Sequence, residues 1–143
     1  MMRFSPCAWY CYELPGMEGD WEVTDTTEKT VITATDGSCS IEIVAARKAA
    51  KAEDMEISDL HEVFLKGEGV HALRTVMTTN SYRVTTLVTR GIGANQSTNL
   101  VCHAFWSNYC AFIRFLGDPE AGAERRMQTF YTIVHSLQPL VSE

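Results

Sequence analysis

Histidines and cysteines are the side chains of this sequence best able to support chemistry, and His61 is the first candidate. His61 and Glu62 match the start of the zinc-protease helix motif, in which histidines at i and i+4 place two metal ligands on one helical face. Leu65 stands where the second histidine is required, so this pair of ligands is incomplete. We therefore interpret His61 as a histidine on the surface of a helix.

The cysteines form no recognisable metal or redox motif. Cys7 and Cys11 lie on one predicted strand, which separates them by about 13 Å, too far for one metal ion or one disulfide. Cys102 and Cys110 fall on opposite faces of a predicted hairpin. His103 is adjacent to Cys102 and so points to the other face, which disfavours an activated Cys–His pair.

The glycine-containing segments match no phosphate-binding or nucleophile motif. Gly91-Ile92-Gly93 lacks the lysine of a phosphate-binding loop and precedes a predicted strand instead of a helix. No Gly-x-Ser-x-Gly nucleophile elbow is present in the sequence. We therefore predict no catalytic residue, no bound metal and no cofactor.

Several strands must position any functional residues in the first part of the chain. Aromatic and β-branched residues predict strands over 7–14, 31–35 and 39–46. Asp36-Gly37 is a strong hairpin signal, because both residues tolerate a positive φ. Residues 47–56 are small and charged, and we interpret them as a linker.

Two amphipathic helices are predicted. The first runs over 57–66, with an apolar side made of Ile57, Leu60, Val63 and Phe64. The second opens at Asp118-Pro119-Glu120, a typical helix start, and ends before Pro139. Its predicted apolar stripe comprises Met127, Phe130, Tyr131, Val134 and Leu137.

The centre of the chain is predicted to be a four-strand meander. Its strands cover 72–79, 82–90, 98–106 and 109–116. Tight turns at Asn80-Ser81 and Ser107-Asn108 would set residue 79 opposite 82 and residue 106 opposite 109. One face of the meander is then apolar, and the other face has a mixed character. The mixed face carries the predicted partner- or ligand-binding residues Arg74, Arg83, His103, Phe105, Phe112 and Arg114.

This mixed face leads to a hypothesis about function. Arginine side chains bind carboxylates or phosphates in a bidentate manner, and aromatic rings add stacking area. We predict a non-catalytic protein-interaction domain, such as an adaptor, chaperone or immunity-type protein. Its mixed face, partly covered by the N-terminal segment, would bind another protein or an acidic peptide.

Three alternatives to this hypothesis remain open. The arginines could be solvated or paired with acids of the chain itself, such as those at 53–62. The chain could instead be a small-molecule binder or enzyme, with an anion-accepting cavity between the sheet and a helix around Arg83, His103 and Arg114. It could also be a structural or dimerising module, because the sequence does not distinguish a monomer from a dimer.

The order of motifs resembles that of the Mog1/PsbP-like domains. The resemblance rests on an aromatic strand ending in Pro15 before Trp21, a hairpin at Asp36-Gly37, and a final helix closing with residues 131–137. It implies an α+β fold, with helices layered on an antiparallel sheet as an α/β/α sandwich. Members of this group are typically binding or adaptor proteins, so the resemblance implies interaction and carries over no functional residue.

Composition sets the remaining expectations. The 143 residues suit a single α+β domain over 1–143, and no apolar run is long enough for a membrane span. A net charge of −6 opposes binding to nucleic acid. An odd number of cysteines, five, and the lack of a signal-peptide pattern favour a reducing, cytoplasmic location.

Overall fold

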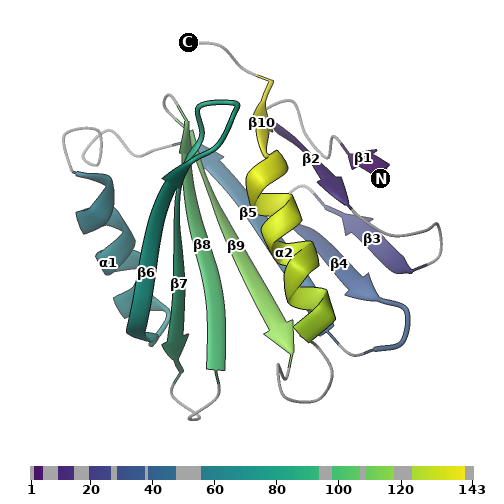
Figure 1. Ribbon diagram of the computed structural model, residues 1–143, viewed down its shortest axis with the longest axis horizontal. Coiled ribbons are helices and arrows are strands. Elements are labelled where there is room, and N and C mark those ends of the chain that lie inside the picture. The colour runs from purple at the N-terminus through teal and green to yellow at the C-terminus, as the bar shows by residue number, and fades with distance from the viewer. Residues whose placement is uncertain are drawn as a thin grey trace.

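A computed structural model describes residues 2–4, 10–14, 20–26, 29–37, 39–47, 56–93, 98–106, 109–117 and 124–140 (Figure 1). Its main feature is a sheet of seven strands in the order β3-β4-β5-β9-β8-β7-β6. All neighbouring strands are antiparallel, and β6 to β9 follow one another as a meander. The strands of this sheet are β3 (Trp21–Asp25), β4 (Thr30–Ala34), β5 (Cys39–Arg47), β6 (His71–Thr79), β7 (Thr85–Ile92), β8 (Thr98–Trp106) and β9 (Tyr109–Gly117).

The alternation of side chains explains why one face of each central strand is buried. In β4, Thr30, Ile32 and Ala34 are buried, whereas Val31 and Thr33 are half-buried. β5 begins with the same period of two, because successive side chains of a strand point to opposite faces. β5 pairs along its whole length with β9, so it joins the N-terminal strands to the meander.

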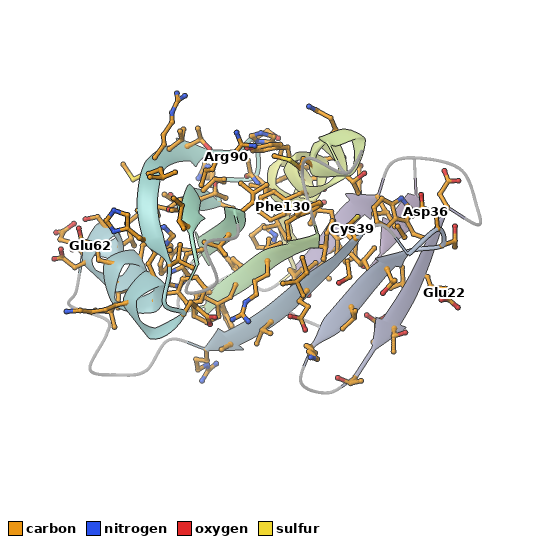
Figure 2. All side chains as sticks on the ribbon, turned by 90° about the horizontal axis from the view of Figure 1, so that it is seen from below. Glu22, Asp36, Cys39, Glu62, Arg90 and Phe130 are labelled. Atoms are coloured by element: carbon orange, nitrogen blue, oxygen red, sulfur yellow. The ribbon has the colours of Figure 1, made fainter. Side chains whose placement is uncertain are left out.

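Two helices cover opposite faces of the sheet. Helix α1 (Ile57–Gly67) packs against a cluster formed by Leu87, Phe105 and Cys110. Helix α2 (Glu124–Ser136) buries Phe130, Ile133 and Val134 in the larger core of the other face. Figure 2 shows α1 below the sheet and α2 above it. The described part of the chain is therefore a three-layer α/β/α arrangement.

A small second sheet joins the two ends of the described chain. β2 (Tyr10–Leu14) lies between β1 (Met2–Phe4) and β10 (Gln138–Pro139). Its Glu13 backbone N–H donates a hydrogen bond to the Ser136 hydroxyl at 2.8 Å. Tyr10, Tyr12 and Leu14 belong to the large core cluster, so β2 is packed together with α2.

The α+β class, the mid-chain helix, the meander and the C-terminal helix are confirmed. Three strands were not predicted: β1, β10, and β3, which begins at Trp21 where a loop was expected to end. Residues 7–9 of the predicted strand over 7–14 and residues 48–55 of the predicted linker over 47–56 lie outside the described residues. The predicted helix start at Asp118 lies outside them as well.

The predicted register is confirmed for the second hairpin and wrong for the first. Trp106 pairs with Tyr109 as expected, but Thr79 pairs with Thr85 and not with Tyr82. The reason is a longer turn, in which the backbone N–H of Asn80 donates a hydrogen bond to the carbonyl oxygen of Val84. The turn therefore spans residues 81–83 and ends with a residue at positive φ, a common solution for three-residue hairpin loops.

This register moves Arg74 to a different face from the one predicted. Arg74 pairs with Arg90, and Met77 pairs with Leu87. Arg74, Val76 and Thr78 therefore point to the α2 face, whereas Thr75 and Met77 point to the α1 face.

The side chain of Asn80 ties this turn to the end of α2. Its Oδ1 accepts hydrogen bonds from the backbone N–H groups of Tyr82 and Val84, at 2.9 and 3.1 Å. Its Nδ2 donates a hydrogen bond to the carbonyl oxygen of Leu137 at 3.0 Å. One side chain thus fixes the hairpin and satisfies a carbonyl just beyond the helix, where intrahelical partners are lacking.

Replacing Asn80 should therefore destabilise the fold at two places at once. We expect Asn80→Ala to lower the free energy of unfolding by about 1–3 kcal/mol, the usual cost of leaving such groups unsatisfied. The neighbouring exposed residue gives a matched control, and Ser81→Ala should change stability little. Urea denaturation of both variants measures the difference, and equal midpoints would contradict the role assigned to Asn80.

Candidate functional site

Three residues of the predicted recognition face lie together, but two of them are buried and the third, Phe112, is half-buried. The ring of His103 lies 4.1 Å from that of Phe105 and 4.3 Å from that of Phe112, centroid to centroid. Phe64 of α1 stacks on Phe112 at 4.4 Å. His103 and Phe105 are only 3% and 5% exposed. These rings pack beneath α1, which covers His103 and Phe105 and leaves Phe112 only partly open to solvent.

Helix α1, and not the N-terminal segment, covers this face. Ile57 and Leu60 of α1 pack on the cluster beneath it. The predicted partial cover by the N-terminal segment is wrong for its described part, because β2 packs with α2 on the opposite side. The helix is also rotated from its predicted orientation: Val63 is 62% exposed, whereas His61 and Leu65 are buried.

His61 is therefore a buried histidine, and its interpretation as a surface residue is wrong. It is 2% exposed, and its Nε2 lies 2.6 Å from the hydroxyl of Thr89. That hydroxyl lies 2.7 Å from the hydroxyl of Thr75 on β6, which continues the chain of polar contacts. Burial lowers the pKa of His61 to about 4, because the charged imidazolium would lose its hydration.

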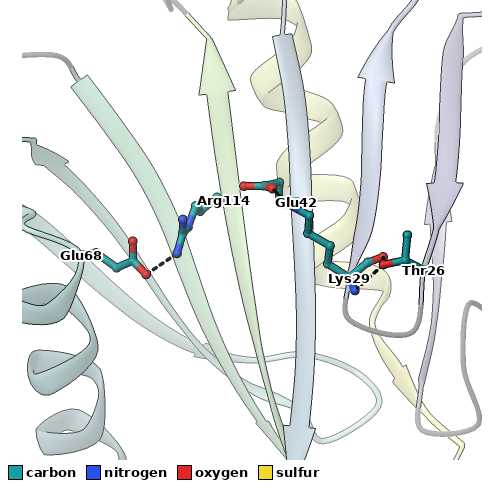
Figure 3. A network of polar contacts seen from close by, with 5 residues as sticks. All are labelled: Thr26, Lys29, Glu42, Glu68 and Arg114. Carbon is teal, nitrogen blue, oxygen red and sulfur yellow. Dashed lines mark hydrogen bonds and ion pairs between the residues drawn. The ribbon is translucent and has the colours of Figure 1, made fainter.

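Arg114 shares this face but is paired with an acid of the chain itself (Figure 3). Its guanidinium forms an ion pair with Glu68, directly after α1. Its cross-strand neighbour Glu42 binds Lys29 at 2.8 Å. These residues line a pocket of about 330 Å³ in which both signs of charge are present. Arg114 thus fits the alternative in which an arginine pairs with the chain's own carboxylates.

The remaining two predicted residues, Arg74 and Arg83, lie elsewhere. Arg83 is exposed in the turn between β6 and β7, with a φ of 65°. Arg74 is on the α2 face of β6. The fold therefore brings together His103, Phe105, Phe112 and Arg114 but neither Arg74 nor Arg83. The predicted anion-accepting cavity around Arg83, His103 and Arg114 is not formed by these three residues.

A different basic site lies on the α2 face, and we call it the arginine pocket. Arg74 and Arg90 face each other across β6 and β7 at its rim, and Tyr131 and His135 reach it from α2. The pocket encloses about 370 Å³. Its lining is completed by Val76, Thr78, Val88 and Leu100, so no carboxylate is among the described residues that line it.

Arg90 is held in place by α2. Its Nη2 donates a hydrogen bond to the Met127 sulfur at 3.7 Å. Neither Arg74 nor Arg90 takes part in the ion pairs found between described residues, which join Lys29 to Glu42 and Arg114 to Glu68. The arginine pocket therefore presents two guanidinium groups whose charges are not balanced by the described part of the chain.

Acidic and basic residues are unevenly distributed along the sequence, which also favours a basic site here. The stretch from Gly69 to Gly117, which spans the meander, contains four arginines and no aspartate or glutamate. All 18 acidic residues lie outside it. This acid-free stretch is the sequence signal that could have indicated a basic site. In the predicted register Arg90 did not lie opposite Arg74, so this pair of arginines was missed.

β6 borders the arginine pocket and forms one edge of the main sheet. All nine of its residues are exposed. Among them, Leu73 and Met77 are each 61% exposed and Val76 is 41% exposed, unusually high values for large apolar side chains. In the described part of the chain β6 pairs only with β7, so its outer backbone groups face away from the sheet.

The cysteines of the described chain offer no reactive thiol at this site. Cys11, Cys39, Cys102 and Cys110 are buried and not in disulfides. Burial raises the pKa of the Cys102 thiol, so its nucleophilic thiolate form is disfavoured. As predicted, Cys102 and Cys110 point to opposite faces, since they belong to the two different core clusters. Cys7 lies outside the described residues.

Comparison with known proteins identifies the fold. No protein-family model matches the sequence, and no curated protein is significantly similar to it. Among solved structures, the chain is similar to the solution structure of cyanobacterial PsbP (CyanoP) from Synechocystis sp. PCC 6803. The TM-score is 0.70 at 12% sequence identity, over 96% of this chain and 91% of that chain. The chain therefore has a PsbP-like fold, which confirms the resemblance inferred from the motif order.

Neither helix, as far as it is described, is long and apolar enough to span a lipid bilayer.

Burial of His61 predicts a specific pH dependence of stability. The unfolded chain takes up a proton near pH 6.5, whereas the folded chain resists protonation until about pH 4. The stability that depends on a neutral His61 is therefore fully present above pH 6.5 and is lost as the pH falls towards 4, by on the order of 3 kcal/mol.

Denaturation across this pH range, with two variants, tests the assignment. His61→Gln removes the titrating group and should flatten the decline, whatever its effect on stability at neutral pH. His71→Gln removes an exposed histidine of β6 and should leave the decline unchanged. An undiminished decline in His61→Gln would show that another group is responsible.

Proposed function

We propose that this PsbP-like chain is a non-catalytic protein-interaction domain, which binds an extended, acidic segment of a partner protein along β6. The observation that carries the proposal is the exposed edge strand: nine consecutive exposed residues, three of them large and apolar. An extended segment could add to this edge as a further strand, with main-chain hydrogen bonds supplying affinity.

The two edges of the main sheet differ in a way that supports this proposal. Natural proteins protect exposed sheet edges with short strands and charged side chains. β3, at the other edge, follows this rule, because it has five residues and exposes Glu22 and Asp25. β6 is longer and has a single charged residue, Arg74. An edge this long and this apolar is expected where another strand binds.

Charge favours an acidic partner over a second copy of this chain. In an antiparallel β6–β6 dimer, the two-fold axis would place both arginine pockets side by side on the same sheet face. Arg74 and Arg90 of each copy would then repel those of the other, and the meander has no carboxylate to offset them. An acidic segment would instead place negative charges next to Arg74 and Arg90.

The buried polar groups support a binding role more than a catalytic one. His61 and His103 lie beneath α1, and Cys102 lies in the core of the opposite face. A substrate in solvent would have to displace a helix to reach them. The accessible polar groups, at the arginine pocket, are suited to binding anions.

Selection of peptides from a random library displayed on phage tests this function whatever the identity of the partner protein. We expect the wild-type chain to enrich peptides that lose binding, by about tenfold or more, to a Leu73→Lys/Met77→Lys variant. Both side chains are mostly exposed, so the variant should fold normally, while its lysines protect the edge as they do in natural sheets.

Leu116→Lys is the matched control, because it places a lysine at an exposed leucine near the end of β9, away from β6. Selected peptides should bind this variant as they bind the wild type. Binding should also slow amide hydrogen exchange in β6. Failure to enrich any peptide, or equal loss of binding in both variants, would rule out strand addition at β6.

A further inference from the structure

The two faces of β6 differ, and this difference specifies the chemistry of the partner. Resting on the proposed strand addition, we infer that the bound segment alternates apolar and acidic residues, and that its acidic side chains enter the arginine pocket. Alternate residues of an added strand point to opposite faces, so each face of β6 selects every second residue of the partner.

On the α2 face, the neighbours of an added strand would be Arg74, Val76 and Thr78. Behind them lie Arg90 on β7 and His135 on α2, which complete the arginine pocket. A carboxylate can accept bidentate hydrogen bonds from an arginine, and such charge-assisted bonds are stronger than neutral ones. This face therefore selects aspartate or glutamate.

The facing arginines make an anion especially favourable there. Like charges directly opposite on neighbouring strands destabilise a sheet. Arg74 and Arg90 are such a pair, and the ion pairs among described residues do not neutralise them. A carboxylate placed between the two guanidinium groups would remove this repulsion. Binding to an acidic segment should consequently weaken as the salt concentration rises.

The size of the pocket agrees with side chains as its ligands. About 370 Å³ is near the lower limit of pockets that take whole small molecules. Val76, Val88 and Leu100 provide apolar surface for the methylene groups of a glutamate, with the arginines at the rim to bind its carboxylate.

On the α1 face, acidic residues of a partner would be unfavourable. Thr75 and Met77 point to this face, and Met77 is 61% exposed. Helix α1 contacts β6 and exposes Asp59 and Glu62. Carboxylates of the partner would be repelled by these acids, whereas an apolar side chain would cover Met77. This face therefore selects apolar residues, and the two preferences together give the alternating pattern.

Two synthetic peptides of the length of β6 test the inference. Both contain the same valines and glutamates, in strict alternation in one and in two separate blocks in the other. Titration by fluorescence anisotropy should show the alternating peptide binding the wild-type chain at least about tenfold more tightly than the blocked peptide. Arg74→Gln and Arg90→Gln should each weaken the alternating peptide by about tenfold.

Arg83→Gln is the matched control, because it removes the same charge from an exposed position in the neighbouring turn. It should change the affinity by less than about twofold, since a distant exposed charge is screened. Equal binding of the two peptides, or equal losses in Arg83→Gln and Arg74→Gln, would overturn the inference.

Two further outcomes separate this inference from the proposed function. If neither synthetic peptide binds but the displayed library yields peptides that depend on β6, strand addition stands and the alternating acidic pattern is wrong. If inorganic phosphate alone raises the melting temperature in an Arg74-dependent manner and no peptide binds, the pocket takes small anions, and both statements fail.

Discussion

The hydrogen bonds of Asn80 fix the register of β6 and the end of α2 at the same time. Because its side chain closes the turn before Val84, Thr79 meets Thr85, and Arg74 is placed opposite Arg90 on the α2 face. Because its amide also binds the carbonyl of Leu137, α2 is held over the same face. The arginine pocket lies between these two elements. A turn shorter by one residue would send Arg74 to the α1 face, and the pocket would lose one of its two rim arginines.

The two sides of the sheet differ in how their polar and charged side chains are accommodated. On the α1 side, rings from β8, β9 and α1 pack together, His61 is kept neutral by burial, and Arg114 is neutralised by Glu68. The α2 side has a large core but leaves a basic concavity next to the β6 edge. Burial and ion pairing therefore account for His61 and Arg114 on the α1 side, whereas Arg74 and Arg90 on the α2 side take part in neither of the ion pairs among described residues.

The sequence was sufficient for the layers of the fold but not for the site. Hydrophobic periodicity and turn residues identified both helices and the strands of the meander, because these signals are local. The register of the first hairpin depended on whether Arg83 adopts a positive φ, and residue type does not decide this for arginine as it does for glycine. The error exchanged the faces of β6 and dispersed the predicted arginine cluster. The rotation of α1 was also missed, because His61 was expected to be polar and exposed, whereas in the core its Nε2 has the Thr89 hydroxyl as a partner.

The small sheet has a consequence for the order of folding during synthesis. β2 is made early, yet its neighbour β10 and its hydrophobic cover α2 come from residues 124–140, more than a hundred positions later. A nascent chain that has completed the seven-stranded sheet still holds Tyr10, Tyr12 and Leu14 without these contacts. The contacts of β2 with α2 and β10 can therefore form only after residues 124–140 have been made, and until then an apolar face of the sheet lacks its helical cover.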